Sequence, residues 1–108
     1  MRLANIAQTV NVLQAMILTD GERMIKTPTY HVFNMYKVHH DAMLLPMHLD
    51  ASDYEFNGER IPAISATASK DSLGTVHLTI SNLHARESQA VRVEVRGEPV
   101  GEVVRAEV

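Results

Sequence analysis

The sequence of 108 residues contains no cysteine. A disulfide framework, a cysteine-based zinc site and a cysteine nucleophile are therefore excluded. Basic residues are not in excess either, because 10 Lys and Arg stand against 13 Asp and Glu and the formal net charge is −3. We therefore expect no nucleic-acid partner. The length suffices for one domain but not for a (β/α)₈ barrel, which needs about 250 residues.

A continuous hydrophobic segment is also missing. Four amide side chains interrupt the uncharged run over residues 3–19 at every third position: Asn5, Gln8, Asn11 and Gln14. Each amide would need a hydrogen-bond partner inside a bilayer, and the apolar part of a signal peptide is normally continuous. The sequence accordingly predicts neither a membrane span nor an export signal.

The N-terminal part of the chain has the hydrophobic periodicity of helices. Apolar residues over 3–18 recur at intervals of three, four and seven, which predicts a helix that ends before Gly21. Its opposite face carries amides but no charge, so we expect this helix to be covered on most sides. Thr27 and Pro28 are typical of the N-cap and first position of a second helix. This helix is expected to end at the basic and protonatable residues 37–40.

After Asp41 the hydrophobic period changes to two, which indicates β-strands. Strands are expected at residues 43–49, 54–56, 61–69, 76–81, 91–95 and 103–108, with a tight turn at Asn57 and Gly58. Pro46 restricts the first of them to an edge or a bulge. Short strands at this spacing are typical of an antiparallel sandwich, yet sandwiches generally use seven strands or more. We therefore expect an incomplete sandwich.

The six histidines and the acidic residues show no catalytic or metal-binding pattern. His39 and His40 are adjacent, so on a helix they diverge by about 100° and cannot face one ion. His77 lies opposite the apolar face of its strand and is expected to be solvated. The carboxylates fall in turns, at helix ends and on polar strand faces, so none is assigned to a catalytic pair. No metal and no cofactor are expected.

Three blocks of sequence resemble the α-L-arabinofuranosidases of glycoside hydrolase family 51. NIAQTVNVLQAMILT at residues 5–19 is similar to the last helix of the family's catalytic barrel, and the match continues through TPTYHVFNMYKVH at 27–39 and DAMLLP at 41–46. SATASK at 65–70 and VHLTISN at 76–82 are similar to the start of its C-terminal β-sandwich.

The resemblance implies a mainly β fold with N-terminal helices. Residues 1–41 would form the end of the catalytic (β/α)₈ barrel, meaning its last helical segment and a connecting helix. Residues 42–108 would form an incomplete C-terminal domain, a partial antiparallel, jelly-roll-like β-sandwich. The upstream barrel of the same parent chain is then a partner, and family members are homo-oligomers with a cytoplasmic location.

The resemblance also implies the function of the parent. Family members hydrolyse terminal non-reducing α-L-arabinofuranosyl residues from arabinan and arabinoxylan oligosaccharides with retention of configuration. Both catalytic glutamates would lie upstream, so the chain contains no catalytic residue and is expected to be inactive alone. A glutamine near the end of the last barrel strand contacts the sugar in the family, and Gln8 is the best match for this substrate-binding residue. Asn5 and Asn11 are weaker candidates.

The alternative is a non-catalytic β-sandwich module for carbohydrate binding or protein association. Such a module would need exposed aromatic residues on one face of a sheet. Beyond Asp41 the only aromatic rings are those of Tyr54 and Phe56, and both lie near the expected turn at Asn57 and Gly58.

Overall fold

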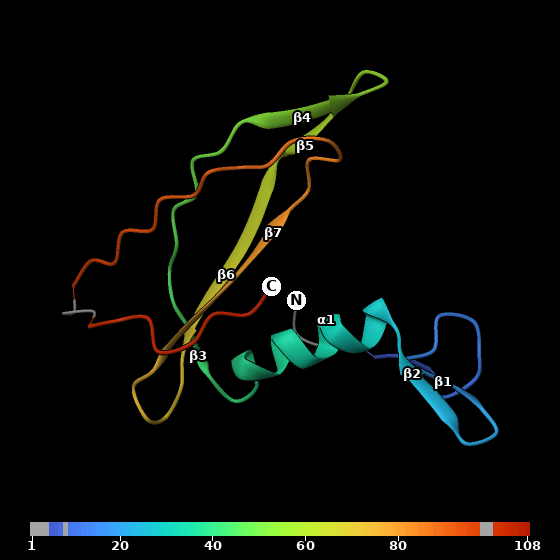
Figure 1. Ribbon diagram of the computed structural model, residues 1–108. Coiled ribbons are helices and arrows are strands. Elements are labelled where there is room, and N and C mark those ends of the chain that lie inside the picture. Colours follow the sequence, from blue (N-terminus) through green and yellow to red (C-terminus); the bar gives the residue numbers. More distant parts are fainter. Residues whose placement is uncertain (1–4, 8, 98–100) are drawn as a thin grey trace.

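The computed structural model describes residues 5–7, 9–97 and 101–108 of the chain (Figure 1). Within these residues, the regular secondary structure is mainly antiparallel strands, with one short α-helix. The elements follow in the order β1 (Ile17–Asp20), β2 (Arg23–Lys26), α1 (Pro28–Tyr36), the 3₁₀ turn η1 (Lys37–His39), β3 (Met43–Leu44), β4 (Asp53–Phe56), β5 (Glu59–Pro62), β6 (Ile64–Lys70) and β7 (Val76–Asn82). The mainly β class expected from the sequence is confirmed.

The N-terminal segment forms a loop and a hairpin where a helix was expected. Asn11 and Gln14 have positive φ angles of 53° and 62°, which a right-handed helix does not allow. Residues 17–20 then pair antiparallel with 23–26 around Gly21, whose φ is 56°. The helix expected over 3–18 is therefore wrong for its described part. The spacing of its apolar residues is helical, but the backbone hydrogen bonds of a turn at 12–15 and of the β1–β2 ladder produce a loop and a hairpin.

The second expected helix is confirmed, and it begins at the predicted residues. α1 starts at Pro28, directly after Thr27, and η1 extends it to His39. Pro28 loses nothing at this position, because the first helical N–H has no partner within the helix. Thr27 has the extended backbone of an N-cap residue, but its side chain makes no capping hydrogen bond.

Two separate sheets follow the helix. β4 and β5 form a hairpin whose turn residues, Asn57 and Gly58, have φ angles of 52° and 83°, as a type I′ turn requires. β6 pairs with β7 along its whole length, with Ala66 opposite Ile80, and β3 adds two residues to the other edge of β6. The strand expected over 43–49 is shorter than expected and ends before Pro46, which has no N–H to donate.

The last two expected strands are wrong. Residues 91–95 and 103–108 form no strand, and no ladder hydrogen bond joins their described backbone to another segment. Each segment instead carries a local ion pair two positions apart, Arg96 with Glu94 and Arg105 with Glu107. Alternating apolar and polar residues give a strand one apolar and one polar face, but a strand forms only where a neighbouring segment pairs with it in register.

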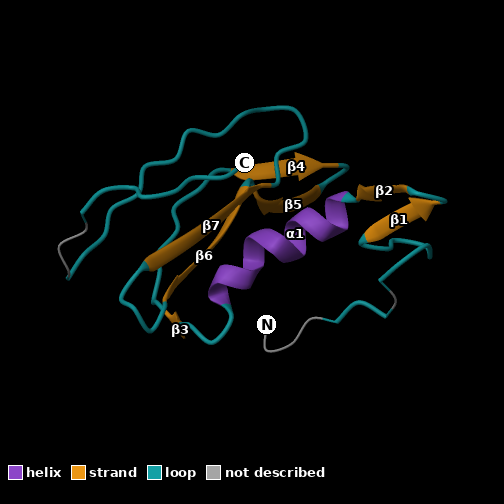
Figure 2. Cartoon of the chain, turned by 60° about the horizontal axis from the view of Figure 1, so that its bottom comes forward, coloured by secondary structure: helices purple, strands orange, loops and turns teal. Residues whose placement is uncertain are grey.

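The chain is open and has a small core. Figures 1 and 2 show the C-terminal end of α1 near one end of the β6–β7 sheet, while the β1–β2 hairpin projects away from the sheet. The radius of gyration is 16.9 Å, against about 13 Å for a compact domain of this length. The accessible surface is 9660 Å², against about 6,000 Å² for a compact monomer of this mass.

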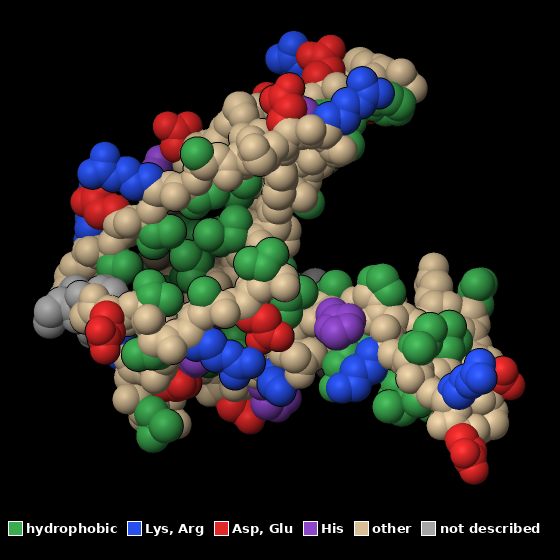
Figure 3. All heavy atoms as spheres, in the orientation of Figure 1, with side chains coloured by type: hydrophobic (Ala, Val, Ile, Leu, Met, Phe, Trp, Pro, Cys, Tyr) green, Lys and Arg blue, Asp and Glu red, His purple; other side chains and the backbone are tan. Residues whose placement is uncertain are grey.

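The described side chains leave much apolar surface uncovered. Among the residues that the structure describes, the buried apolar ones are Ala15, Ala63 and Ile64, and no large side chain is fully buried. Figure 3 shows hydrophobic side chains gathered in a hollow of the face that it presents. This surface fits a chain that packs against further protein, because monomeric proteins rarely expose large apolar patches.

Candidate functional site

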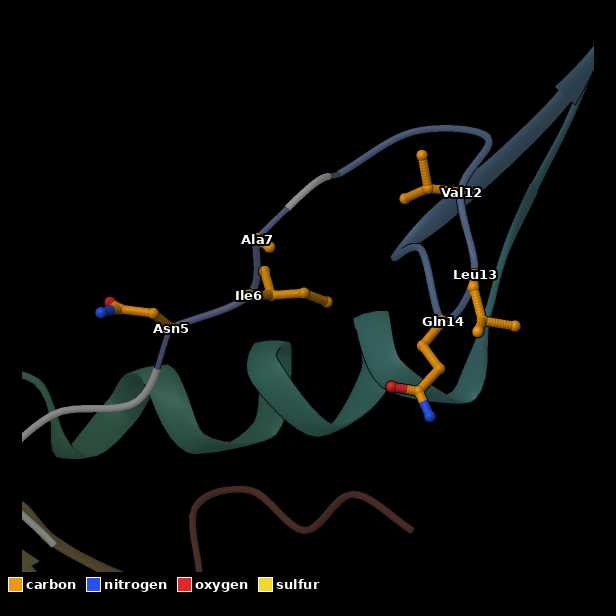
Figure 4. Close-up of a pocket in the computed structure, with 6 residues that line it drawn as sticks. All are labelled: Asn5, Ile6, Ala7, Val12, Leu13 and Gln14. Carbon is orange, nitrogen blue, oxygen red and sulfur yellow. The ribbon is translucent and has the colours of Figure 1, made fainter.

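The loop before β1 contains the region of the expected sugar contact. Gln8 itself lies outside the described residues. Described residues that precede and follow it in the sequence line a pocket of about 300 Å³, which Figure 4 shows: Asn5, Ile6, Ala7, Val12, Leu13 and Gln14. The amides of Asn5 and Gln14 stand at opposite ends of this pocket, with the apolar side chains between them (Figure 4). The described wall is therefore apolar in the middle and polar at its ends.

The side chain of Asn11 forms hydrogen bonds to Thr19. Its Nδ2 donates to Oγ1 of Thr19 at 2.8 Å, and the backbone N–H of Thr19 donates to its Oδ1 at 2.7 Å. Asn is one of the few residues that tolerate a positive φ, and these two bonds hold Asn11 in that conformation. Of the two weaker candidates, Asn11 thus stabilises the loop, while Asn5 lines the pocket.

Thr27 attaches this loop to the start of α1. Its hydroxyl donates to the carbonyl oxygen of Ala15 at 2.7 Å and lies 3.3 Å from that of Met16. Its backbone N–H also donates to the Met16 carbonyl at 3.0 Å. Ala15 is among the few buried residues, so its carbonyl needs a protein partner. The hydroxyl expected to cap the helix therefore holds the loop in place.

A second polar cluster lies at the other end of the helix. The ring of His39 lies 2.7 Å from Oγ of Ser69 through Nδ1 and 2.7 Å from Oγ1 of Thr79 through Nε2. Ser69 belongs to β6 and is 2% exposed, whereas Thr79 belongs to β7. One imidazole therefore joins the end of the helical segment to two neighbouring strands.

His77 extends this cluster and corrects an expectation. It was expected to be solvated, but its side chain is only 23% exposed and its Nε2 lies 2.9 Å from Oδ2 of Asp71. The other carboxylate oxygen of Asp71 accepts the backbone N–H groups of Leu73 and Thr75, each at 2.9 Å. Asp71 comes directly before a Ser-Leu-Gly-Thr turn, and an Asp at this place typically accepts hydrogen bonds from the turn backbone. This pattern could have indicated that Asp71 is held in place beside His77.

The cluster shifts two pKa values. The hydrogen bond from His77, followed by those from the backbone, lowers the pKa of Asp71 below its ordinary value. Partial burial lowers the pKa of His39, and the charge of nearby His77 lowers it further, with the two ring centroids 6.5 Å apart. The neutral form of His39 and the ionised form of Asp71 are thus favoured.

His39 and His40 diverge, as expected from their adjacency. His40 is 82% exposed and pairs with Asp41 at 3.2 Å. Within the described ranges, no three or more His, Asp or Glu side chains are grouped so that they could hold a metal ion. No helix in those ranges combines the length and apolar character needed to cross a membrane.

The rings of Tyr30 and Tyr54 each contact a neighbouring side chain. Tyr30 has the ammonium of Lys26 4.6 Å from its ring centroid, and Tyr54 packs edge-on against the ring of His84 at 4.6 Å. Phe56, which is 60% exposed, lies beside the turn of the β4–β5 hairpin. These rings do not form one aromatic surface of the kind that a carbohydrate-binding module would need.

Comparisons with known proteins agree with the fold. The family model described as the α-L-arabinofuranosidase C-terminal domain matches residues 1–108. An intracellular exo-α-L-arabinofuranosidase of Bacteroides ovatus is 44% identical over 111 residues, which cover 98% of this chain and 22% of that protein. The crystal structure of the GH51 arabinofuranosidase from Xanthomonas axonopodis pv. citri superposes with a TM-score of 0.69 at 51% identity, over 76% of this chain and 17% of that one.

The fold and the matches together define a β-rich domain of a glycosidase. The chain belongs to the family of α-L-arabinofuranosidase C-terminal domains. It spans about a fifth of the length of the two relatives.

Proposed function

We propose that this chain is the C-terminal part of a retaining α-L-arabinofuranosidase that acts in the cytoplasm on arabinan and arabinoxylan oligosaccharides. The match of the family model to all 108 residues is the observation that carries the proposal. The catalytic acid/base and nucleophile belong to an upstream barrel of the same parent. Retention requires two carboxyl groups about 5 Å apart on either side of the sugar, and this chain supplies neither.

In this proposal the two parts of the chain have different structural roles. Residues 1–41 complete the barrel and lead out of it through α1, and residues 42–108 form the sandwich domain. The large exposed apolar surface supports a covering partner, since burying such a surface contributes about 25 cal/mol per Å². The barrel of the parent is that partner, and the parent assembles as a homo-oligomer.

Within this assignment, Gln8 binds the sugar. An amide can donate to one hydroxyl and accept from another without adding a charge. Its described neighbours Ala7 and Asn5 line the pocket before β1, and Asn11 and Thr27 hold the same loop in place.

The test of inactivity compares the chain with its parent on an aryl α-L-arabinofuranoside. The parent should release the aryl alcohol and the 108-residue chain should not exceed a heat-treated control. Turnover by the chain alone would show that a catalytic pair lies within it. Saturable binding of arabino-oligosaccharides by the chain alone, measured by calorimetry, would instead support a free-standing binding module.

The test of Gln8 is made in the parent. Gln8→Ala should raise KM or lower kcat/KM by about tenfold, the equivalent of about 1.4 kcal/mol of lost sugar hydrogen bonding. Gln14→Asn is the comparison variant, because it keeps an amide in the pocket lining and Asn tolerates the positive φ at this position, so its effect should be smaller. Equal effects of both changes would assign the loss to the loop and not to a sugar contact.

A further inference from the structure

The turn at residues 12–15 holds a glutamine in a conformation that glutamine rarely adopts. The backbone N–H of Ala15 donates to the carbonyl oxygen of Val12 at 3.0 Å and closes the turn, and Gln14 inside it has a φ of 62°. At a positive φ the side chain is crowded by its own backbone, so Gly and Asn are the residues usually found at such a place. Gln14 therefore makes this turn less stable than Gly or Asn would.

The strain at Gln14 is not compensated as it is at Asn11, which has a positive φ in the same loop. Asn tolerates this conformation, and the amide of Asn11 makes two hydrogen bonds to Thr19. The amide of Gln14, in contrast, has no hydrogen-bond partner among the residues that the structure describes. Strained residues of this kind are concentrated at functional sites, where the side chain contacts a ligand.

The position of Gln14 indicates what its amide can contact. Gln14 lines one end of the pocket before β1, with Asn5 at the other end (Figure 4). The pocket volume, about 300 Å³, is comparable with that of the smallest ligand sites. Leu13, next to Gln14 at the tip of the turn, is 95% exposed, so the tip projects from the described part of the chain. The amide is therefore accessible to a molecule outside this chain.

The proposed function supplies such a molecule. An enzyme that removes a terminal sugar holds this sugar between its two catalytic carboxyl groups, and the remainder of the oligosaccharide extends outward. Gln8, the proposed contact of the terminal sugar, precedes the turn in the same N-terminal segment. A side chain on a projecting turn fits the outward part of the substrate, where an amide can donate to one sugar hydroxyl and accept from another.

We propose that Gln14 is a specificity-determining residue whose amide binds the sugar from which the terminal arabinofuranosyl group is cleaved. This role rests on the proposed function, since it requires a parent that acts on arabinofuranosyl oligosaccharides. The contact is a hydrogen bond to the leaving group and involves no covalent step, so it affects the preference among substrates. An Asn amide, which the backbone would tolerate better, is one methylene shorter and extends less far from the turn.

The experiment is made in the parent enzyme and compares two substrates, arabinotriose and phenyl α-L-arabinofuranoside. The phenyl leaving group has no hydroxyl groups that could bond to an amide, so the ratio of the two kcat/KM values reports contacts to the leaving sugar. Gln14→Met keeps the side-chain length and the backbone strain but removes the amide. The ratio of arabinotriose to phenyl arabinofuranoside should therefore fall about fivefold, as expected for one lost sugar hydrogen bond. Gln8→Ala should lower both kcat/KM values together and leave their ratio near that of the parent.

A second variant separates substrate binding from folding. Gly adopts a positive φ without strain, so Gln14→Gly should unfold at the same temperature as the parent or at a higher one, although its ratio falls as in Gln14→Met. A purely structural role would instead lower the unfolding temperature and leave the ratio unchanged.

Failure of this role can be distinguished from failure of the proposed function. An unchanged ratio in Gln14→Met, in a parent that hydrolyses both substrates, would overturn the role of Gln14 and leave the proposed function in place. A parent that hydrolyses neither substrate would overturn the proposed function, and the role of Gln14 with it.

Discussion

The hydroxyl of Thr27 donates to the carbonyl oxygen of Ala15 at 2.7 Å, although 12 positions separate the two residues. A threonine directly before a helix normally turns its hydroxyl toward the first backbone N–H groups of that helix. Here the hydroxyl turns backward and satisfies a buried carbonyl of the preceding loop. The helix start and the loop next to Gln8 are therefore stabilised by the same side chain.

The first prediction concerns this hydroxyl. Thr27→Val keeps the side-chain shape but removes the donor, so the Ala15 carbonyl becomes unsatisfied and the free energy of unfolding should fall by about 1–3 kcal/mol. Thr27→Ser keeps the donor and should recover most of the loss. Urea denaturation followed by circular dichroism measures both variants. If Thr27→Val is as stable as the native chain, the hydrogen bond to Ala15 does not contribute to stability.

The second prediction concerns Ser69. Ser69→Ala deprives Nδ1 of His39 of its partner in a partly buried site, so the free energy of unfolding should fall by about 1 kcal/mol or more. Ser65→Ala, an exposed position on the same strand β6, is the matched control and should change it by less than about 0.5 kcal/mol. Equal losses at both serines would point to strand propensity instead of the histidine contact.

The elements predicted correctly from the sequence are those encoded by local signals. Thr27 and Pro28 mark the start of α1, and the pair Asn57 and Gly58 marks the β4–β5 turn. In both places the residues restrict the backbone without help from distant parts of the chain. The alternation over 76–81 was equally informative because β7 has a neighbour in register along its whole length.

The elements predicted wrongly depend on partners that a pattern does not specify. The pair Asp20 and Gly21 is also typical of a hairpin turn. Because the apolar residues before the pair have helical spacing, Gly21 was interpreted as the end of a helix. The alternation over 91–95 has no ladder partner in the described chain, so it forms no strand. The contacts of His39 cross 30 and 40 positions, and no spacing rule predicts such a meeting.

The third prediction concerns the β4–β5 turn. Gly58 has a φ of 83°, a conformation that L side chains rarely adopt, although a methyl group there would meet no atom within 4 Å. Gly58→Ala should therefore destabilise the hairpin by about 1 kcal/mol through backbone strain alone. Gly101→Ala is the control, because Gly101 also has open space around it and does not have a positive φ. Amide hydrogen exchange of Tyr54 and Ile61, which face each other in the hairpin, reports the change locally.

The fourth prediction concerns Asp71 and the decrease in the free energy of unfolding at acid pH. Its pKa is lowered in the folded chain, so its ionised form stabilises the fold above the ordinary value of 3.8 and this contribution is lost as the pH falls through the folded pKa. Asp71→Asn keeps the acceptor for Leu73 and Thr75 but removes the charge. The variant should be less stable than the native chain at neutral pH, and the difference should shrink below pH 3.8.

The largest cause of this shift can be tested through its partner. Because the hydrogen bond from His77 lowers the pKa of Asp71 most, the pH-dependent part of the Asp71→Asn effect should be smaller in a His77→Gln background. Asp71→Ala, which also removes both turn bonds, should remain destabilising at every pH. Urea midpoints of the variants across the acid range give the comparison. A pH-dependent effect of unchanged size in the His77→Gln background would assign the stabilisation to the turn backbone and not to the imidazole.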